Sequence, residues 1–261
     1  MSCLFAGTAA VAQQASNPLD DLLKMQMNWD ESRSNDSAAA AITLKFYSYE
    51  QHKDDGKSFT SYYLYAPGLK ADQPYTLIRW QIGWDAKQPP MQPVEGDLYV
   101  NARGVVMCRK PSDEEMHKAA PDIDEDARLN VIAAGAPGEP MRYALYSEKE
   151  AVVAMGRLIV NRFQADDKTC HVEAIRAMGG AEIVLVEGTG FTPKTTVELS
   201  RQTSGKPTTA KFKTDENGRL ETVAILMEQG ETHGTASITM KSDACAPSVS
   251  VQWGKETYQV Q

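Results

Sequence analysis

The sequence predicts an all-β protein made of two tandem β-sandwich domains, and three observations support this fold class. From residue 41 onward, short segments alternate apolar and polar residues with a period of two, which is typical of half-buried strands. Clusters of Gly, Pro, Asn and Asp separate these segments at the spacing of hairpins. Turn and strand features of the first half recur in the second half, which indicates a tandem repeat. We therefore expect one domain over residues 41–165 and another over residues 166–261.

The first residues carry the features of an export signal. Residues 1–12, MSCLFAGTAAVA, contain no charged side chain and end in Ala10-Val11-Ala12, a small-x-small pattern typical of signal cleavage. The positively charged start of a signal peptide is missing, so we interpret this stretch as the remnant of a truncated signal peptide. An irregular apolar N-terminus is the alternative. The expected localisation is secreted or periplasmic, and no later stretch reaches the roughly 20 apolar residues of a transmembrane segment.

Residues 13–40 predict a short helix followed by a polar linker. Asn17 can cap the helix, Pro18 suits its first turn, and Asp20 favours its positive end. The polar stretch DESRSNDS at residues 30–37 then separates the helix from the first domain.

The first domain is expected to open with a hairpin. Ile42, Leu44 and Phe46 alternate with the polar residues Thr43 and Lys45. After a turn at 52–56, the chain returns as an aromatic-rich segment over 59–65, which is the pattern of a hairpin. The same pattern predicts further strands at 75–82, 97–100, 105–108, 129–134, 141–146 and 152–160.

One helical insert is expected near residues 112–120. Ser112 and Glu115 have the spacing of a capping box, and Pro121 ends the segment. The acidic stretch over 122–126 follows, with the alternate carboxylates of a calcium loop. Because Ala127 stands where an EF-hand needs glycine, we exclude that motif. A weak calcium site stays an alternative to a solvated acidic loop, and the sequence predicts no metal ligands.

The second domain shows the clearer strand pattern. Strands are expected at 170–177, 183–187, 196–201, 208–213, 220–227, 236–241 and 249–253. The turn over 215–218, Asp-Glu-Asn-Gly, is the strongest hairpin signal in the chain, because Asn-Gly favours the tight turns that join antiparallel strands.

Three cysteines remain after the expected cleavage: Cys108, Cys170 and Cys245. An oxidising compartment favours pairing, and an odd count leaves one cysteine over. Cys170 opens the second domain and Cys245 lies near its end, so we predict a disulfide between these two. Cys108 would then be a buried, unreactive thiol at the end of a strand. The alternative is that all three are reduced and buried. No Cys-x-x-Cys or Cys/His cluster indicates zinc.

A family resemblance rests on segments of the second domain. The strand over 183–186, the turn Gly-Thr-Gly-Phe-Thr-Pro over 188–193 and the hairpin over 214–218 resemble the bacterial immunoglobulin-like modules related to the IPT/TIG group, across residues 169–245. The first domain is similar more loosely, through residues 66–69 and 138–140. The resemblance implies immunoglobulin-like sandwiches that act as spacers, adhesive or ligand-binding domains, with no catalytic residues.

The net charge of the chain limits the classes of ligand that it is expected to bind. The net charge is −8 and Lys and Arg are scattered, which disfavours nucleic acid because phosphate contacts need clustered cations. A glycan, a cell-wall component or a partner protein outside the cytoplasm is the expected ligand class. The oligomeric state is not predicted.

Trp84, Tyr47 and Tyr49 are the candidate ligand-binding residues. Flat exposed rings stack against sugar faces or apolar peptide surfaces. Trp84 stands beside Gly83 at the start of a predicted loop, and the two tyrosines share a strand face. The alternative is that these rings fill the sandwich core.

No pattern indicates catalysis. The four histidines, His52, His117, His171 and His233, lie in separate segments, and nucleophile, zinc-protease and phosphate-loop motifs are absent from the sequence. We therefore expect no enzyme activity and no cofactor, and interpret the chain as an exported non-catalytic binding or structural module. The alternative is a hydrolase with paired carboxylates, which only geometry would identify.

Overall fold

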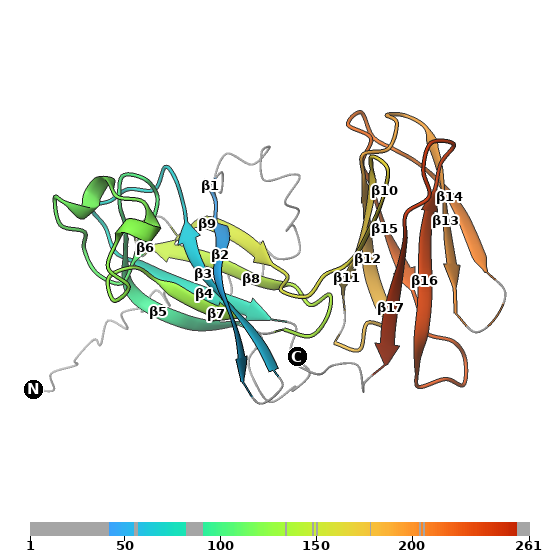
Figure 1. Ribbon diagram of the computed structural model, residues 1–261, viewed down its shortest axis with the longest axis horizontal. Coiled ribbons are helices and arrows are strands. Elements are labelled where there is room, and N and C mark those ends of the chain that lie inside the picture. Colours follow the sequence, from blue (N-terminus) through green and yellow to red (C-terminus); the bar gives the residue numbers. More distant parts are fainter. Residues whose placement is uncertain are drawn as a thin grey trace, which may run out of the picture.

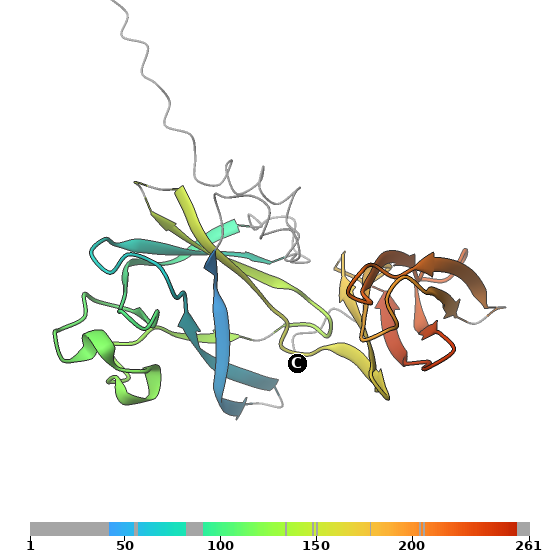
Figure 2. The same ribbon diagram turned by 90° about the horizontal axis from the view of Figure 1, so that it is seen from above.

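The structure is a computed structural model that describes residues 42–54, 57–81, 91–133, 135–147, 149, 151–177, 179–203, 205 and 207–254. These residues form strands and two short 3-10 turns, so the predicted all-β class is confirmed. The strands gather in two groups that lie side by side, as the two views in Figure 1 and Figure 2 both show.

The first group contains the strands up to residue 158. Its six-stranded sheet has the order β1-β9-β8-β4-β5-β6 and its three-stranded sheet the order β2-β3-β7. Leu64 and Val131 of the smaller sheet and Leu77 and Leu145 of the larger sheet share one buried cluster. The strands are β1 (Ile42–Thr43), β2 (Lys45–Asp54), β3 (Lys57–Tyr65), β4 (Tyr75–Gln81), β5 (Met91–Val100), β6 (Val106–Met107), β7 (Asn130–Ala133), β8 (Met141–Ser147) and β9 (Ala151–Leu158).

The second group is a sandwich of two four-stranded sheets, with the orders β10-β11-β12-β15 and β14-β13-β16-β17. Val172 and Val184 from the first sheet and Val197 and Ile238 from the second belong to one buried core. The strands are β10 (Phe163–Asp167), β11 (Cys170–Arg176), β12 (Ile183–Thr189), β13 (Thr196–Gln202), β14 (Thr208–Lys213), β15 (Leu220–Ile225), β16 (His233–Lys241) and β17 (Ser248–Gly254).

Alternation explains how these strands are oriented. In β13, Val197 and Leu199 point into the core, while Thr196 and Glu198 face outward, because successive side chains of a strand point to opposite faces. Each strand predicted from the alternation pattern is present. Strand β10 was not predicted; it crosses the predicted domain boundary and forms a hairpin with β11.

The predicted helical insert is not an α-helix. Its capping box is present, but it leads only into 3-10 turns, η1 (Glu115–His117) and η2 (Ala120–Asp122). Pro121 lies at the start of η2 and has no N–H to donate, so a helix begun at Ser112 cannot continue through it.

Cys170 and Cys245 form the predicted disulfide, with Cα atoms 6.2 Å apart. The prediction of a buried Cys108 is wrong, because its side chain is exposed. The buried stretch before it ends with Met107, the last residue of β6, and Cys108 follows at the surface.

Several predicted features lie outside the described residues. These are the signal remnant over 1–12, the helix and linker over 13–40, and Trp84. Within the described part of the chain, no helix is long and apolar enough to cross a membrane.

Candidate functional site

Four tyrosines form a row on the outer face of the β2–β3 hairpin: Tyr47, Tyr49, Tyr63 and Tyr65. Alternation places them there, because Phe46 and its neighbours on the opposite face pack against the core. The rings of Tyr47 and Tyr65 meet edge to face with centroids 5.0 Å apart. Those of Tyr49 and Tyr63 stack with centroids 4.4 Å apart and an interplanar angle of 8°. We call these four residues the tyrosine row.

A β-bulge aligns two of these rings. The pairing of β2 with β3 shifts by one residue between Ser48 and Glu50, which leaves Tyr49 as the extra residue. Bulges change the direction of the bulged side chain. The Tyr49 ring therefore lies on that of Tyr63, although Tyr63 is paired in register with Tyr47.

Arg128 holds the stacked pair in place. Its guanidinium carbon lies 5.3 Å from the Tyr49 ring centroid and 5.0 Å from that of Tyr63, within the range of cation–π attraction. The Arg128 Nη1 donates to the carbonyl of Ala120 at 3.0 Å. The Ala120 amide in turn donates to the hydroxyl of Tyr65 at 2.9 Å. The η2 turn is therefore hydrogen-bonded both to Arg128 and to Tyr65.

Exposure differs along the tyrosine row. Tyr47 is 49% exposed, whereas Tyr49, Tyr63 and Tyr65 are half-buried by their neighbours. Ile132 of β7 is 63% exposed in the same sheet. The structure thus brings the predicted residues Tyr47 and Tyr49 to one face. Tyr63, Tyr65 and Arg128 were not predicted as members of this site, because their contacts depend on strand register.

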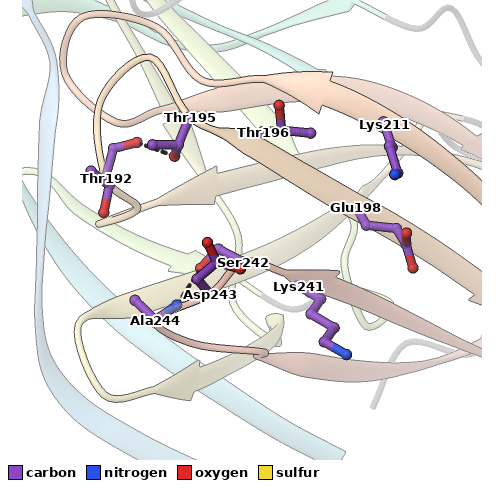
Figure 3. A pocket seen from close by; sticks show the side chains of 9 residues that line it. All are labelled: Thr192, Thr195, Thr196, Glu198, Lys211, Lys241, Ser242, Asp243 and Ala244. Carbon is purple, nitrogen blue, oxygen red and sulfur yellow. Dashed lines mark hydrogen bonds between the residues drawn. The ribbon is translucent and has the colours of Figure 1, made fainter.

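A second surface feature is a groove of about 670 Å³ on the outer face of the sheet β14-β13-β16-β17 (Figure 3). Polar side chains dominate it, and no aromatic residue lines it. The lining residues are Thr192, Thr195, Thr196, Glu198, Lys211, Lys241, Ser242, Asp243 and Ala244. This groove was not predicted from the sequence, because its two walls are turns that are distant in sequence: the turn before β13 and the turn after β16.

The edge strand β15 carries an apolar stripe. Val223 and Ile225 alternate with buried residues and are 58% and 49% exposed, and Met227 just beyond the strand is 52% exposed. On the neighbouring strand β12, Leu185 and Ile183 lie opposite Val223 and Ile225. These side chains carry no polar group that would orient a ligand.

The shifted pKa values have structural causes. Hydrogen bonds from Arg109 and Ser112 lower the pKa of Glu115 from 4.5 to about 2. Burial raises the pKa of Tyr143 and of Tyr62, which both face the core. Partial desolvation by neighbouring atoms, followed by the charge of Glu95, raises the pKa of the exposed Cys108 thiol. None of these groups lines the groove.

Metal-ligating side chains do not gather in the described residues: no three of His, Cys, Asp or Glu are placed to hold an ion there. The closest histidine–carboxylate contact is surface-exposed, with His171 Nδ1 2.8 Å from Asp166 Oδ1 across the β10–β11 hairpin. That pair is a cross-strand contact on a sheet edge.

Comparison with known proteins finds no matching family model and no similar curated protein. Among solved structures, the chain is similar to a "Biofilm associated protein - BSP domain" with 10% sequence identity and a TM-score of 0.21. The match covers 91% of this chain and 55% of that chain, so this chain spans about half the length of that one. A likeness this weak establishes neither a shared fold nor a shared function.

Proposed function

We propose that this protein is an exported, non-catalytic binding module of two tandem immunoglobulin-like sandwich domains, over residues 41–165 and 166–261, and that it binds its ligand through the tyrosine row. Each buried cluster lies within one strand group, which supports the domain division: one lies in the second group, and the first group has a main core and a smaller cluster around Met107 and Ile123, against which Tyr63 and Tyr65 pack. The disulfide supports an oxidising location, since such bonds persist outside the cytoplasm.

One observation carries the binding proposal: the half-exposed ring of Tyr47 stands at the end of an ordered row of rings. Tyr65 fixes the Tyr47 ring edge-on, and Arg128 fixes the stacked pair beside it. A ring already held in one orientation loses little entropy when a ligand stacks on it. Flat ring faces and phenol hydroxyls suit the C–H face and the hydroxyls of a sugar ring. A glycan or cell-wall component is therefore the proposed ligand class, with a partner protein as the alternative.

The test is retention of the purified chain on insoluble polysaccharides and peptidoglycan. Tyr47→Ala is expected to lower retention about tenfold or more, since one aromatic contact at a binding centre contributes about 1–3 kcal/mol. Tyr146→Ala removes a half-buried ring from β8 in the other sheet and serves as the matched control. Equal retention of the wild type and Tyr47→Ala would contradict the tyrosine row as the site. Trp84→Ala, tested in parallel, examines the predicted site that lies outside the described residues.

The absence of catalysis is a separate part of the proposal. Release of soluble reducing ends from a retained polysaccharide would favour the alternative, a hydrolase with paired carboxylates. Glu198 and Asp243, which both line the groove, would then be the first residues to substitute with their amides.

A further inference from the structure

The groove in Figure 3 has a charged end, formed by three residues that are paired with one another across three neighbouring strands. Glu198 of β13 is paired in register with Lys211 of β14 and also with Lys241 of β16. Glu198 therefore lies between two lysines on the outer face of the sheet, as Figure 3 shows. Among the described residues, neither lysine takes part in an ion pair. Two ammonium groups and one carboxylate leave this end with one excess positive charge.

The other end of the groove carries hydroxyls. Thr192 and Thr195 come from the turn before β13, and Ser242 comes from the turn after β16 (Figure 3). Asp243 adds an exposed carboxylate at this end. The Thr195 hydroxyl already donates to the Thr192 carbonyl, and the Ser242 hydroxyl is bonded within its own turn. The Thr192 hydroxyl can donate and accept hydrogen bonds and the Asp243 carboxylate accepts them, so these two groups suit a ligand that is rich in hydroxyls.

A buried hydroxyl holds in place the turn before β13, which forms one wall of the groove. Thr214 is 4% exposed, and its Oγ1 donates to the Thr192 carbonyl at 2.8 Å. The same oxygen accepts from the Thr195 amide at 3.0 Å. The turn that carries two of the groove hydroxyls is therefore bonded to the strand beside it.

The disulfide holds in place the turn after β16, which forms the other wall of the groove. The Ser242 amide donates to the Cys245 carbonyl at 2.9 Å, and Cys245 is bonded to Cys170 at the start of β11. Lys168 Nζ donates to the Ala244 carbonyl at 2.6 Å. Because both walls are fixed before binding, a ligand would pay little entropy for ordering them.

From these contacts we propose that the groove binds a carboxylated glycan, such as a chain of uronic acid units. The ligand carboxylate would contact the Lys211 and Lys241 ammonium groups on the solvent side of Glu198, which lies between the two lysines in the sheet. The sugar hydroxyls would contact Thr192 and Asp243. Charge-assisted hydrogen bonds supply the selectivity for the acidic unit. The chain as a whole is acidic, with a net charge of −8, so its overall field repels such a polymer. The attraction is confined to the lysine end of the groove, because Asp243 balances the excess positive charge over the groove as a whole. This site is independent of the tyrosine row.

The probe is an oligogalacturonate, and its binding to the full chain is measured by isothermal titration calorimetry at two salt concentrations. Lys211→Gln/Lys241→Gln is expected to weaken binding about tenfold or more, since it removes both charge-assisted hydrogen bonds to the ligand carboxylate. Wild-type binding is expected to weaken as salt rises. Lys110→Gln/Lys149→Gln is the matched control, because it removes the same charge from exposed positions of the first strand group.

Each outcome is decisive. Loss of binding in the groove variant alone supports the proposal. No binding of the oligogalacturonate to the wild type, an equal loss in the control variant, or equal binding of a neutral dextran would overturn it. Retention of Tyr47→Ala on insoluble polysaccharide reports on the tyrosine row, and calorimetry of the groove variant with the oligogalacturonate reports on the groove, so a failure of one site and a failure of the other give different results.

Discussion

At the scale of single residues, a few buried polar groups determine how the surface is shaped. Thr214 is the clearest case, because one hydroxyl satisfies two backbone groups of the turn that forms a groove wall. Gly218 acts through its backbone: its φ is 74°, and a Cβ there would come within 2.0 Å of the Phe191 carbonyl oxygen. Both residues belong to the segment around the predicted 215–218 turn. The local turn chemistry and the tertiary contact therefore support the same geometry.

Thr214→Val tests the buried hydroxyl. The substitution keeps the size of the side chain and leaves the Thr195 amide and the Thr192 carbonyl without this partner. We expect the free energy of unfolding to fall by about 1–3 kcal/mol. Urea unfolding measures it, and Thr209→Val on the exposed face of β14 is the control, expected to change stability by less than about 0.5 kcal/mol. Equal effects in both variants would contradict a structural role for the Thr214 hydroxyl.

At the scale of elements, the capping box shows how a short motif can be correct while the element built on it differs. The Glu115 amide donates to Ser112 Oγ at 3.4 Å, and the Ser112 amide donates back to Glu115 Oε2 at 3.0 Å. Arg109 adds two hydrogen bonds to the same carboxylate, at 2.7 and 2.8 Å. Pro121 then limits the segment to 3-10 turns. The box therefore fixes a loop, and that loop supplies the Ala120 contacts to the tyrosine row.

The Glu115 carboxylate makes stability depend on pH. Its pKa is about 2 in the folded protein and near 4.5 when unfolded, so the unfolded chain binds the proton first as pH falls. The stabilisation is complete above about pH 4.5 and is lost as pH decreases towards 2. Glu115→Gln is expected to destabilise the protein by about 1–2 kcal/mol near neutral pH, allowing for screening at the exposed Arg109.

Urea unfolding of the wild type and Glu115→Gln between pH 6 and pH 2 checks this prediction. The difference between the two proteins should shrink towards the acid end of the range. A difference that stays constant with pH would show that the charge of Glu115 is not what stabilises the loop. Glu114→Gln, whose side chain is exposed and paired only with Lys118, is the matched control.

At the scale of the whole molecule, contacts between the two strand groups decide whether they act as one body. Arg157 of β9 forms an ion pair with Glu187 of β12, at 3.2 Å, and both side chains are 13% exposed. The Arg176 amide donates to the Gly138 carbonyl at 2.8 Å, and the Arg176 side chain is buried. Partly buried ion pairs are costly to break, because the remaining charge loses its partner away from water.

Arg157→Ala is expected to uncouple the two groups. Removing the guanidinium leaves Glu187 with Arg219 as its remaining described partner, at 3.5 Å, and should cost about 1–3 kcal/mol. Scanning calorimetry should show a broadened or split transition, since the groups would unfold with less cooperativity. Lys118→Ala breaks an exposed ion pair and should leave the transition unchanged. A single unaltered transition in Arg157→Ala would contradict coupling through this pair.

The strands, the all-β class and the disulfide could be predicted from the sequence because each depends on a local or compositional signal. Alternation of apolar and polar residues orients a strand wherever that strand lies, as Val197 and Leu199 show. The pairing of Cys170 with Cys245 was predicted from the expected oxidising compartment and from their positions at the two ends of the second predicted domain. Tyr47 was predicted as a candidate binding residue by the same strand alternation.

The tertiary structure alone decided which side chains meet. The stack of Tyr49 on Tyr63 depends on a bulge, and the pairing of Glu198 with two lysines depends on the register of three strands, of which β13 and β16 are far apart in sequence. Cys108 is exposed because the buried stretch ends at Met107, a boundary that alternation does not mark. Alternation acts along one strand, so the sequence indicated which side chains share a strand face. The tyrosine row and the groove form between strands, so only the folded chain brought their residues together.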